Sequence, residues 1–304
     1  MLFCAAESRR RDEPLFATAS RGLAWALLEV PRTWRSDPLD GCGLPEPVVA
    51  RLRAFAAVGG CRVVFLRRGF GPVERPVLFL AVVRSREPFL KGWRLDSYED
   101  LLDVDLAAEA RDPERSADSL CSGPLLLVCT HGRHDPCCAR WGLRLYRELC
   151  RRAPEASWQV SHVGGDRFAA NLLWLPWGIF YGRLAAGDLE RLLDAVDRDE
   201  VLLDRFRGRG CYPFPVQAGE YFVRRESGET SAEGPRLLGS RREGDGRWTL
   251  EFAARGSVWT PRVERRPSGE RVRPTCRAAG ESHVPEYRLV GMERRTGRRE
   301  EGGG

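Results

Sequence analysis

The chain has 304 residues, of which 42% are hydrophobic and 30% charged, and its formal net charge is +6 at pH 7. Such a composition is that of a globular protein, and the mild positive charge does not require nucleic acid as a partner. No apolar run approaches the ~18 residues of a membrane-spanning helix. The start of the chain is too short for a signal peptide. We therefore expect a cytoplasmic protein with no membrane or nucleic-acid contact, whose ten cysteines are reduced thiols or metal ligands.

The apolar pattern predicts two similar series of elements, joined by a polar connection at 111–123. In the first series we expect strands at 23–30, 61–67, 76–83 and 89–95, with helices at 45–58 and 98–110. In the second we expect strands at 125–129, 157–162, 171–175 and 179–184, with helices at 137–152 and 187–204. Beyond them we expect a short helix at 216–225, short strands at 247–253, 257–264, 271–276 and 287–292, and disorder from about residue 294.

Two cysteines lie where the second series begins. Cys129 ends an apolar strand, and Cys138 falls in the first turn of the following helix, after an N-cap at Asp135 and a proline at the first helical position. The start of a helix carries partial positive charge, which favours a thiolate over a thiol. Metal ligands must be thiolates, so the two sulfurs are candidate ligands. The alternative is that both are buried packing residues.

A histidine and a carboxylate follow the next strand. His162 ends that strand, Gly164 and Gly165 allow a sharp turn and a close approach to a bulky group, and Asp166 lies one turn further on. We expect His162 and Asp166 to meet the two cysteines at one metal centre. Pairing of Asp166 with Arg167 is the alternative.

These segments resemble a known family. The patterns C-T-H-G-R-H-D-P-C-C-A at 129–139, S-H-V-G-G-D-R-F-A at 161–169 and L-P-W-G-I-F-Y-G-R at 175–183 are similar to those of sucrase/ferredoxin-like proteins, and the resemblance runs from Cys4 to Glu220. It implies a thioredoxin-like ferredoxin with a [2Fe–2S] cluster held by two cysteines and two histidines. By position the ligands are Cys129, Cys138 and His162, and the second histidine falls on Asp166, which departs from the family pattern.

The side chains around these four ligands are expected to support the centre. His131 and His134 would donate hydrogen bonds to it, Arg167 would balance its charge, and the Gly164–Gly165 turn would make room for it. Cys137 would point elsewhere on the helix, and it is the substitute ligand if Asp166 does not bind.

The resulting fold prediction is an α/β (α+β) chain built around a thioredoxin-like ferredoxin domain. Residues 1–112 would form a degenerate N-terminal thioredoxin-like unit, residues 113–205 the ferredoxin unit, and residues 206–304 a β-rich appendage with a disordered tail. The tandem rests on the order of elements alone, and an unrelated α/β packing is the alternative.

The predicted function is electron transfer to an unidentified redox partner protein. The alternatives are a structural zinc site, a metal-free interaction protein and, less favoured because there is no C-x-x-C, a thiol redox enzyme. Nothing singles out the carboxylate pair that a sucrase would need.

Overall fold

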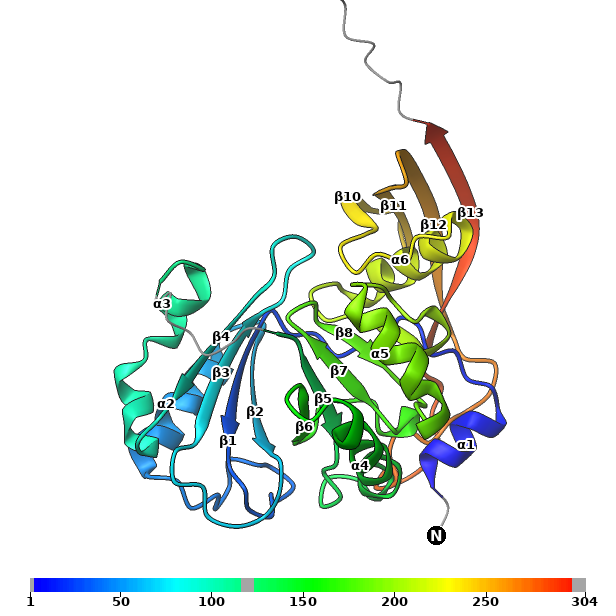
Figure 1. Ribbon diagram of the computed structural model, residues 1–304. Coiled ribbons are helices and arrows are strands. Elements are labelled where there is room, and N and C mark those ends of the chain that lie inside the picture. The colour runs from blue at the N-terminus through cyan, green and yellow to red at the C-terminus, as the bar shows by residue number, and fades with distance from the viewer. Residues whose placement is uncertain (1–2, 116–122, 297–304) are drawn as a thin grey trace, which may run out of the picture.

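The computed structural model describes residues 3–115 and 123–296, which form a large and a small sheet (Figure 1). The mixed α+β class expected from the sequence is observed. The polar connection lies partly outside the described residues, as does the tail beyond Thr296. Residues 294–296, which we expected to be disordered, form the end of a strand. No helix in the described ranges is both long and apolar enough to cross a membrane.

The large sheet has nine strands in the order β4-β3-β1-β2-β6-β5-β7-β8-β9. These strands are β1 (Ala24–Glu29), β2 (Cys61–Arg67), β3 (Val77–Val82), β4 (Phe89–Arg94), β5 (Leu125–Cys129), β6 (Ser157–Val160), β7 (Leu172–Leu175), β8 (Ile179–Tyr181) and β9 (Phe206–Arg209). All but β9 were predicted, with ends that differ by a few residues. β9 falls in the segment expected to be an appendage, yet it pairs with β8 and completes the edge of the large sheet.

The two halves of the large sheet repeat one connectivity. β1 pairs in parallel with β2 and antiparallel with β3, which pairs antiparallel with β4. β5 pairs in parallel with β6 and antiparallel with β7, which pairs antiparallel with β8. The halves meet through a short antiparallel contact between β2 and β6, at Leu66–Val160 and Arg67–Gln159. The element order read from the sequence therefore corresponds to a repeated strand arrangement.

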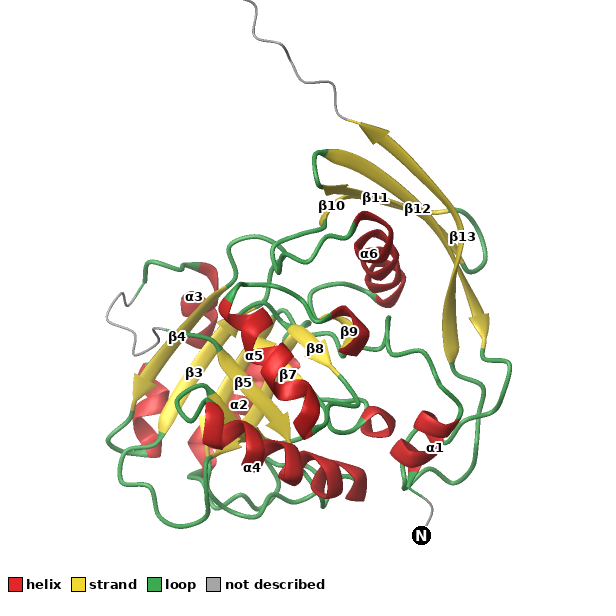
Figure 2. Cartoon of the chain, turned by 45° about the vertical axis from the view of Figure 1, so that its right-hand side comes forward, coloured by secondary structure: helices red, strands yellow, loops and turns green. Residues whose placement is uncertain are grey.

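Helices cover the outer face of each half (Figure 2). The first half carries α2 (Glu46–Ala57), the 3₁₀ helix η1 (Tyr98–Asp103) and α3 (Leu106–Arg111). The second carries the π-helical turn η2 (Cys138–Gly142), α4 (Leu143–Arg152), the 3₁₀ turns η3 (Asp166–Phe168), η4 (Ala186–Asp188) and η5 (Leu203–Arg205), and α5 (Leu189–Asp197). A further helix, α1 (Cys4–Arg10), was not predicted.

Two predicted helices were too long. The helix expected at 98–110 is interrupted at Val104, which is extended, and α3 starts afresh because the Asp105 side chain accepts a hydrogen bond from the Ala108 N–H. The helix expected at 187–204 ends at Asp197, since Asp199 adopts φ = 50°, outside the helical region.

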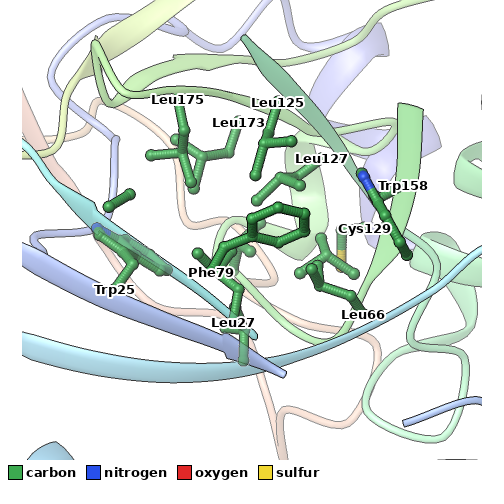
Figure 3. Close-up of a cluster of buried hydrophobic side chains, with 14 of the residues drawn as sticks. Trp25, Leu27, Leu66, Phe79, Leu125, Leu127, Cys129, Trp158, Leu173 and Leu175 are labelled. Atoms are coloured by element: carbon green, nitrogen blue, oxygen red, sulfur yellow. The ribbon is translucent and has the colours of Figure 1, made fainter. Parts of the chain in front are cut away.

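The curled large sheet encloses the main core on its inner face. Strand alternation turns every second side chain of both halves inward. Both halves contribute buried side chains to one apolar cluster, which includes Trp25, Leu27, Leu66 and Phe79 from the first half and Leu125, Leu127, Trp158 and Leu173 from the second (Figure 3). Cys129 belongs to the same cluster, so one predicted ligand is part of the main core.

The small sheet has the order β10-β11-β12-β13 and packs on α6 (Phe214–Ser227). Its strands are β10 (Arg236–Arg242), β11 (Arg247–Ala254), β12 (Ser257–Pro267) and β13 (Pro285–Thr296). The strand expected at 271–276 is wrong. Val272 makes only an isolated bridge to Ser282, and Pro274 has no N–H to donate to a ladder. The 268–284 connection instead runs down to the large sheet beside α1 (Figure 1).

Candidate metal centre

The first two predicted ligands come from a strand end and a helix start. Cys129 is the last residue of β5, and Asp135 caps the following helix by accepting a hydrogen bond from the Cys137 N–H at 2.8 Å. The predicted N-cap is therefore confirmed. Cys138 opens the π-helical turn, and both Cys129 and Cys138 are 1% exposed. Both sulfurs are therefore almost fully screened from water, at the edge of the apolar core.

Gly142 lets the helix approach the strand. A Cβ built on Gly142 would lie 2.0 Å from the Cys129 carbonyl oxygen, so the backbones of η2 and β5 touch where any side chain would clash. π-helical turns inside helices are often found at functional sites, because the extra residue redirects a side chain. Here the turn lies over the end of β5 and holds Cys138 beside Cys129.

The second pair of predicted ligands comes from one tight loop. Gly164 and Gly165 have φ of 95° and 85°, and Asp166 then begins the turn η3. The chain is folded back so that Asp166 Oδ1 lies 3.2 Å from His162 Nδ1. His162 Nδ1 is buried and has this carboxylate as its ion-pair partner in the metal-free protein. A metal that binds at this nitrogen would therefore replace a proton.

The four predicted ligands come together. One donor atom each from Cys129, Cys138 and His162 lie within 4.8 Å of one another, and the same holds for His134, His162 and Asp166. The Cys138 thiol also donates to Asp166 Oδ1 at 3.3 Å, and Asp166 is 3% exposed. Two buried sulfurs, a buried carboxylate and two partly exposed imidazoles thus lie together around His162.

The pKa values of the metal-free residues are strongly coupled. The neighbouring Cys138 thiol lowers the pKa of Cys129 well below its ordinary value, while Cys129 raises that of Cys138. The two sulfurs therefore share one proton. Burial lowers the pKa of His162, but the nearby Asp166 carboxylate and Cys129 sulfur outweigh it and raise that pKa to about 9. Binding of a metal must then displace protons from this centre.

The two loop histidines have different roles. His131 is 2% exposed, accepts the His162 N–H at Nδ1 (3.2 Å) and donates from Nε2 to the Arg35 carbonyl (2.7 Å), so it is held as the neutral Nε2–H form. It fixes the backbone of His162. His134 stacks on the His162 ring with centroids 3.6 Å apart and shields its outer side.

Of the supporting residues, Arg167 does not have its expected partner, whereas the glycine pair makes the expected turn and Cys137 points away as expected. Arg167 forms a 2.6 Å ion pair with Glu13, so it neither pairs with Asp166 nor balances the sulfurs directly. Gly164 and Gly165 are needed because Ser20 and Arg207 crowd them, with a Cβ on Gly165 meeting the Arg207 guanidinium at 2.2 Å. Cys137 points away from this centre, into a separate group of cysteines.

Arg207 is the functional residue that the sequence did not reveal. It is fully buried, donates to the Gly164 carbonyl and to Asn171 Oδ1, and thereby supports the glycine loop from behind. Burial lowers its pKa to about 9, and the charges of Asp166, Cys129 and Cys138 partly offset that effect. It lies in β9, within the segment that we assigned to the β-rich appendage. The only available signal was the alternation of its arginines, which is typical of a strand.

One protein-family model matches the middle part of this chain. The model of the sucrase/ferredoxin-like family matches residues 71–208, which include the whole candidate centre. This match confirms the family resemblance seen in the sequence.

This chain is also similar to the "Altered inheritance of mitochondria protein 32" of Meyerozyma guilliermondii, with 30% identity over 95 residues. The match covers 28% of this chain and 34% of that protein, so the chain spans about a third of the relative's length. No solved structure gives a significant match.

Proposed function

We propose that this protein is a one-electron carrier with a [2Fe–2S] cluster held by Cys129, Cys138, His162 and Asp166. The observation that carries the proposal is the convergence of two buried sulfurs and the partly buried His162 imidazole within 4.8 Å, with the Asp166 carboxylate beside them. When bound, such a cluster accepts and releases one electron, and mixed sulfur and nitrogen ligation raises its potential above that of all-cysteine ferredoxins. The family match supports the assignment.

The repeated strand order supports a further part of the proposal, that each half of the large sheet is a thioredoxin-like unit. Only the second half carries the donor set, because the first half has no cysteine at the end of β1 and no histidine after β2. The first half would then serve to close the inner core over the end of β5, which keeps water from Cys129.

The partner would be another redox protein, and the compartment a reducing one. The nine cysteines within the described residues are all free thiols, as a reducing cytoplasm would keep them. The name of the Meyerozyma relative refers to inheritance of mitochondria and does not specify a chemistry.

A second candidate is a single structural zinc ion at the same four ligands. Short distances favour it, since Cys129, Cys138 and His162 donor atoms lie within 4.8 Å of one another and Asp166 Oδ1 lies 3.3 Å from Cys138 Sγ and 3.2 Å from His162 Nδ1, as ligands of one tetrahedral ion would. Anaerobic purification followed by analysis of iron, acid-labile sulfide and zinc separates the two. A coloured protein with equal iron and sulfide, lost in Cys129→Ser, supports the cluster. A colourless protein whose zinc is lost in Cys129→Ser overturns the electron carrier.

The role of Asp166 is tested by two substitutions. Asp166→His replaces an anionic ligand by a neutral one, so the reduction potential measured by protein-film voltammetry is expected to rise. Asp166→Asn keeps the shape but weakens ligation, and we expect iron to be lost. His134→Ala is the matched control, because His134 touches His162 without being proposed as a ligand. If His134→Ala loses the iron and Asp166→Asn retains it, the fourth ligand is His134 and the assignment of Asp166 is wrong.

A further inference from the structure

A second group of metal-ligating side chains lies behind the first centre. Cys4, Asp135, Cys137 and Cys276 each offer one donor atom, and these atoms all lie within 4.8 Å of one another. Cys4, Asp135 and Cys137 are at most 1% exposed. The four residues come from three distant segments, namely the start of α1, the helix start after β5 and the 268–284 connection.

The sulfur distances fit a tetrahedral ion. The Cys4–Cys137, Cys137–Cys276 and Cys276–Cys4 Sγ pairs are 3.5, 3.3 and 3.5 Å apart. Tetrahedral zinc with Zn–S bonds of about 2.3 Å has sulfur–sulfur edges of about 3.8 Å. A disulfide needs about 2.05 Å and could join only two of the three. An almost equilateral triangle of sulfurs is what three ligands of one ion require.

Asp135 supplies the fourth corner. Its Oδ2 lies 4.0 Å from Cys4 Sγ and accepts the Cys276 N–H at 2.7 Å, while Oδ1 accepts the Cys137 N–H at 2.8 Å. These two bonds fix the carboxylate and hold the backbones of two cysteines toward it. Each oxygen keeps a second lone pair, which is free to ligate.

We propose that Cys4, Asp135, Cys137 and Cys276 bind one structural zinc ion, at a site separate from the proposed redox centre. Three thiolates select a soft or borderline cation, and a carboxylate oxygen at the fourth corner favours Zn²⁺ over Cu⁺. The neighbours Cys137 and Cys138 serve different centres, since adjacent residues on a helix point about 100° apart.

The site explains the path of the 268–284 connection. This segment of 17 residues has no helix or strand, apart from the Val272–Ser282 bridge, and long connections of this kind usually have a function. It leaves the small sheet and places Cys276 against the large one. Neutral thiols form only weak hydrogen bonds, whereas an ion would hold α1 and this connection firmly in place.

The test is metal content in matched cysteine variants of the full chain, purified anaerobically from zinc-containing medium. Wild type is expected to hold one zinc ion per chain at this site. In Cys276→Ser the zinc content of the site should fall at least tenfold, while the iron content stays unchanged. Cys150→Ser, which alters a partly buried cysteine on α4 outside both groups, is the control and keeps that zinc. Cys276→His restores a zinc ligand and is expected to recover binding. Cys129→Ser removes the first centre only.

A second readout is titration of metal-free protein with Co²⁺. Tetrahedral thiolate coordination of Co²⁺ gives near-ultraviolet charge-transfer bands and intense visible d–d bands. These should appear in Cys129→Ser and be absent in Cys129→Ser/Cys276→Ser, with circular dichroism checking that both are folded. The proposal is overturned if wild type holds no more zinc than Cys276→Ser, or if the native mass is two hydrogens lower because two of these thiols are oxidised. Loss of the electron-carrier proposal would leave the zinc result unchanged, because the two centres share no ligand.

Discussion

At the scale of single residues, His162 has the most consequential environment. Its side chain is 21% exposed and lies between a buried carboxylate and a sulfur, which favour the imidazolium. The same atoms that would ligate a metal therefore hold a proton in the metal-free protein. Protein folding and metal loading are linked through this one proton.

This environment predicts a pH dependence of the metal-free protein. The folded pKa of His162 is about 9, above the ordinary 6.5, so the imidazolium stabilises the fold fully below pH 6.5 and loses that effect as the pH rises through 9. The free energy of unfolding should fall by up to about 3 kcal/mol across this window. Denaturant unfolding of wild type and His162→Gln at pH 6 and 10 measures it. Equal pH dependence in both proteins would contradict the assignment.

A second prediction at this scale concerns Gly142. Gly142→Ala places a methyl group 2.0 Å from the Cys129 carbonyl, a backbone atom that cannot rotate away, so η2 must move off β5. We expect a loss of about 1–3 kcal/mol in unfolding free energy and reduced occupancy of the centre. Gly187→Ala is the control, because a Cβ at Gly187 meets nothing within 4 Å. Similar stability of the two variants would show that the strand and helix are not in tight contact.

The sequence predicted the donor set around His162 because each of its members lies next to a strong local signal. Cys129 ends an apolar run, Cys138 follows an N-cap and proline, and Asp166 follows a glycine pair. Cys4 and Cys276 lie 272 residues apart and follow no ligand spacing. Their meeting depends on how α1 and a loop dock, which periodicity does not encode.

At the scale of elements, the strands of the large sheet were predictable because they are fully buried and apolar. β10 was missed for the opposite reason: its burial is irregular, it is rich in arginine, and its register shifts between Leu237 and Gly239. β9 was missed because it reads F-R-G-R, although Arg207 and Arg209 are fully buried. Buried arginines give no apolar signal, so such a strand is found only once its partners are known.

Arg209 of β9 also takes part in a cluster of buried charges that joins β9 to α6. Glu220 Oε1 accepts from Arg209 at 3.1 Å and from Arg224 at 2.9 Å, and all three side chains are fully buried. The Arg224 guanidinium also donates to the Gly234 carbonyl. This cluster lies where the large sheet meets the helix that supports the small one, so it fixes how the two sheets are connected.

Removing the acid from this cluster should be costly. Glu220→Ala leaves two buried guanidinium groups without their counter-charge, and we expect a loss of about 3–5 kcal/mol in unfolding free energy. Glu200→Ala breaks the exposed pair with Arg198 and a bond from Thr230, and should change the stability far less, since solvent screens exposed pairs. Thermal and denaturant unfolding of both variants provides the comparison. A Glu220→Ala protein as stable as Glu200→Ala would mean that the cluster is solvated in solution.

At the scale of the whole molecule, the only lysine reports on opening of the fold. Lys91 is 3% exposed, and its Nζ lies 2.8 Å from Glu109. We expect an amine-reactive ester to label Lys91 at least about 100-fold more slowly in the native protein than in denaturant, a factor that an opening free energy of ~3 kcal/mol produces. The N-terminal amine is the internal control. Fast labelling of Lys91 in native protein would mean that the first half of the sheet opens readily.

Because Cys4 contacts Cys276, the chain between these two residues forms one closed loop in the folded protein. A permanent link between these positions would remove about 5 kcal/mol of conformational freedom from the unfolded chain, since the closed ring is so long. Severing the polypeptide inside the 268–284 connection would open that ring while leaving every strand intact. A protease that cuts there would therefore free Cys276 from the amino-terminal helix, which would still be held by the bonds of Arg9 to the Ala169 carbonyl and of Arg183 to Ser8.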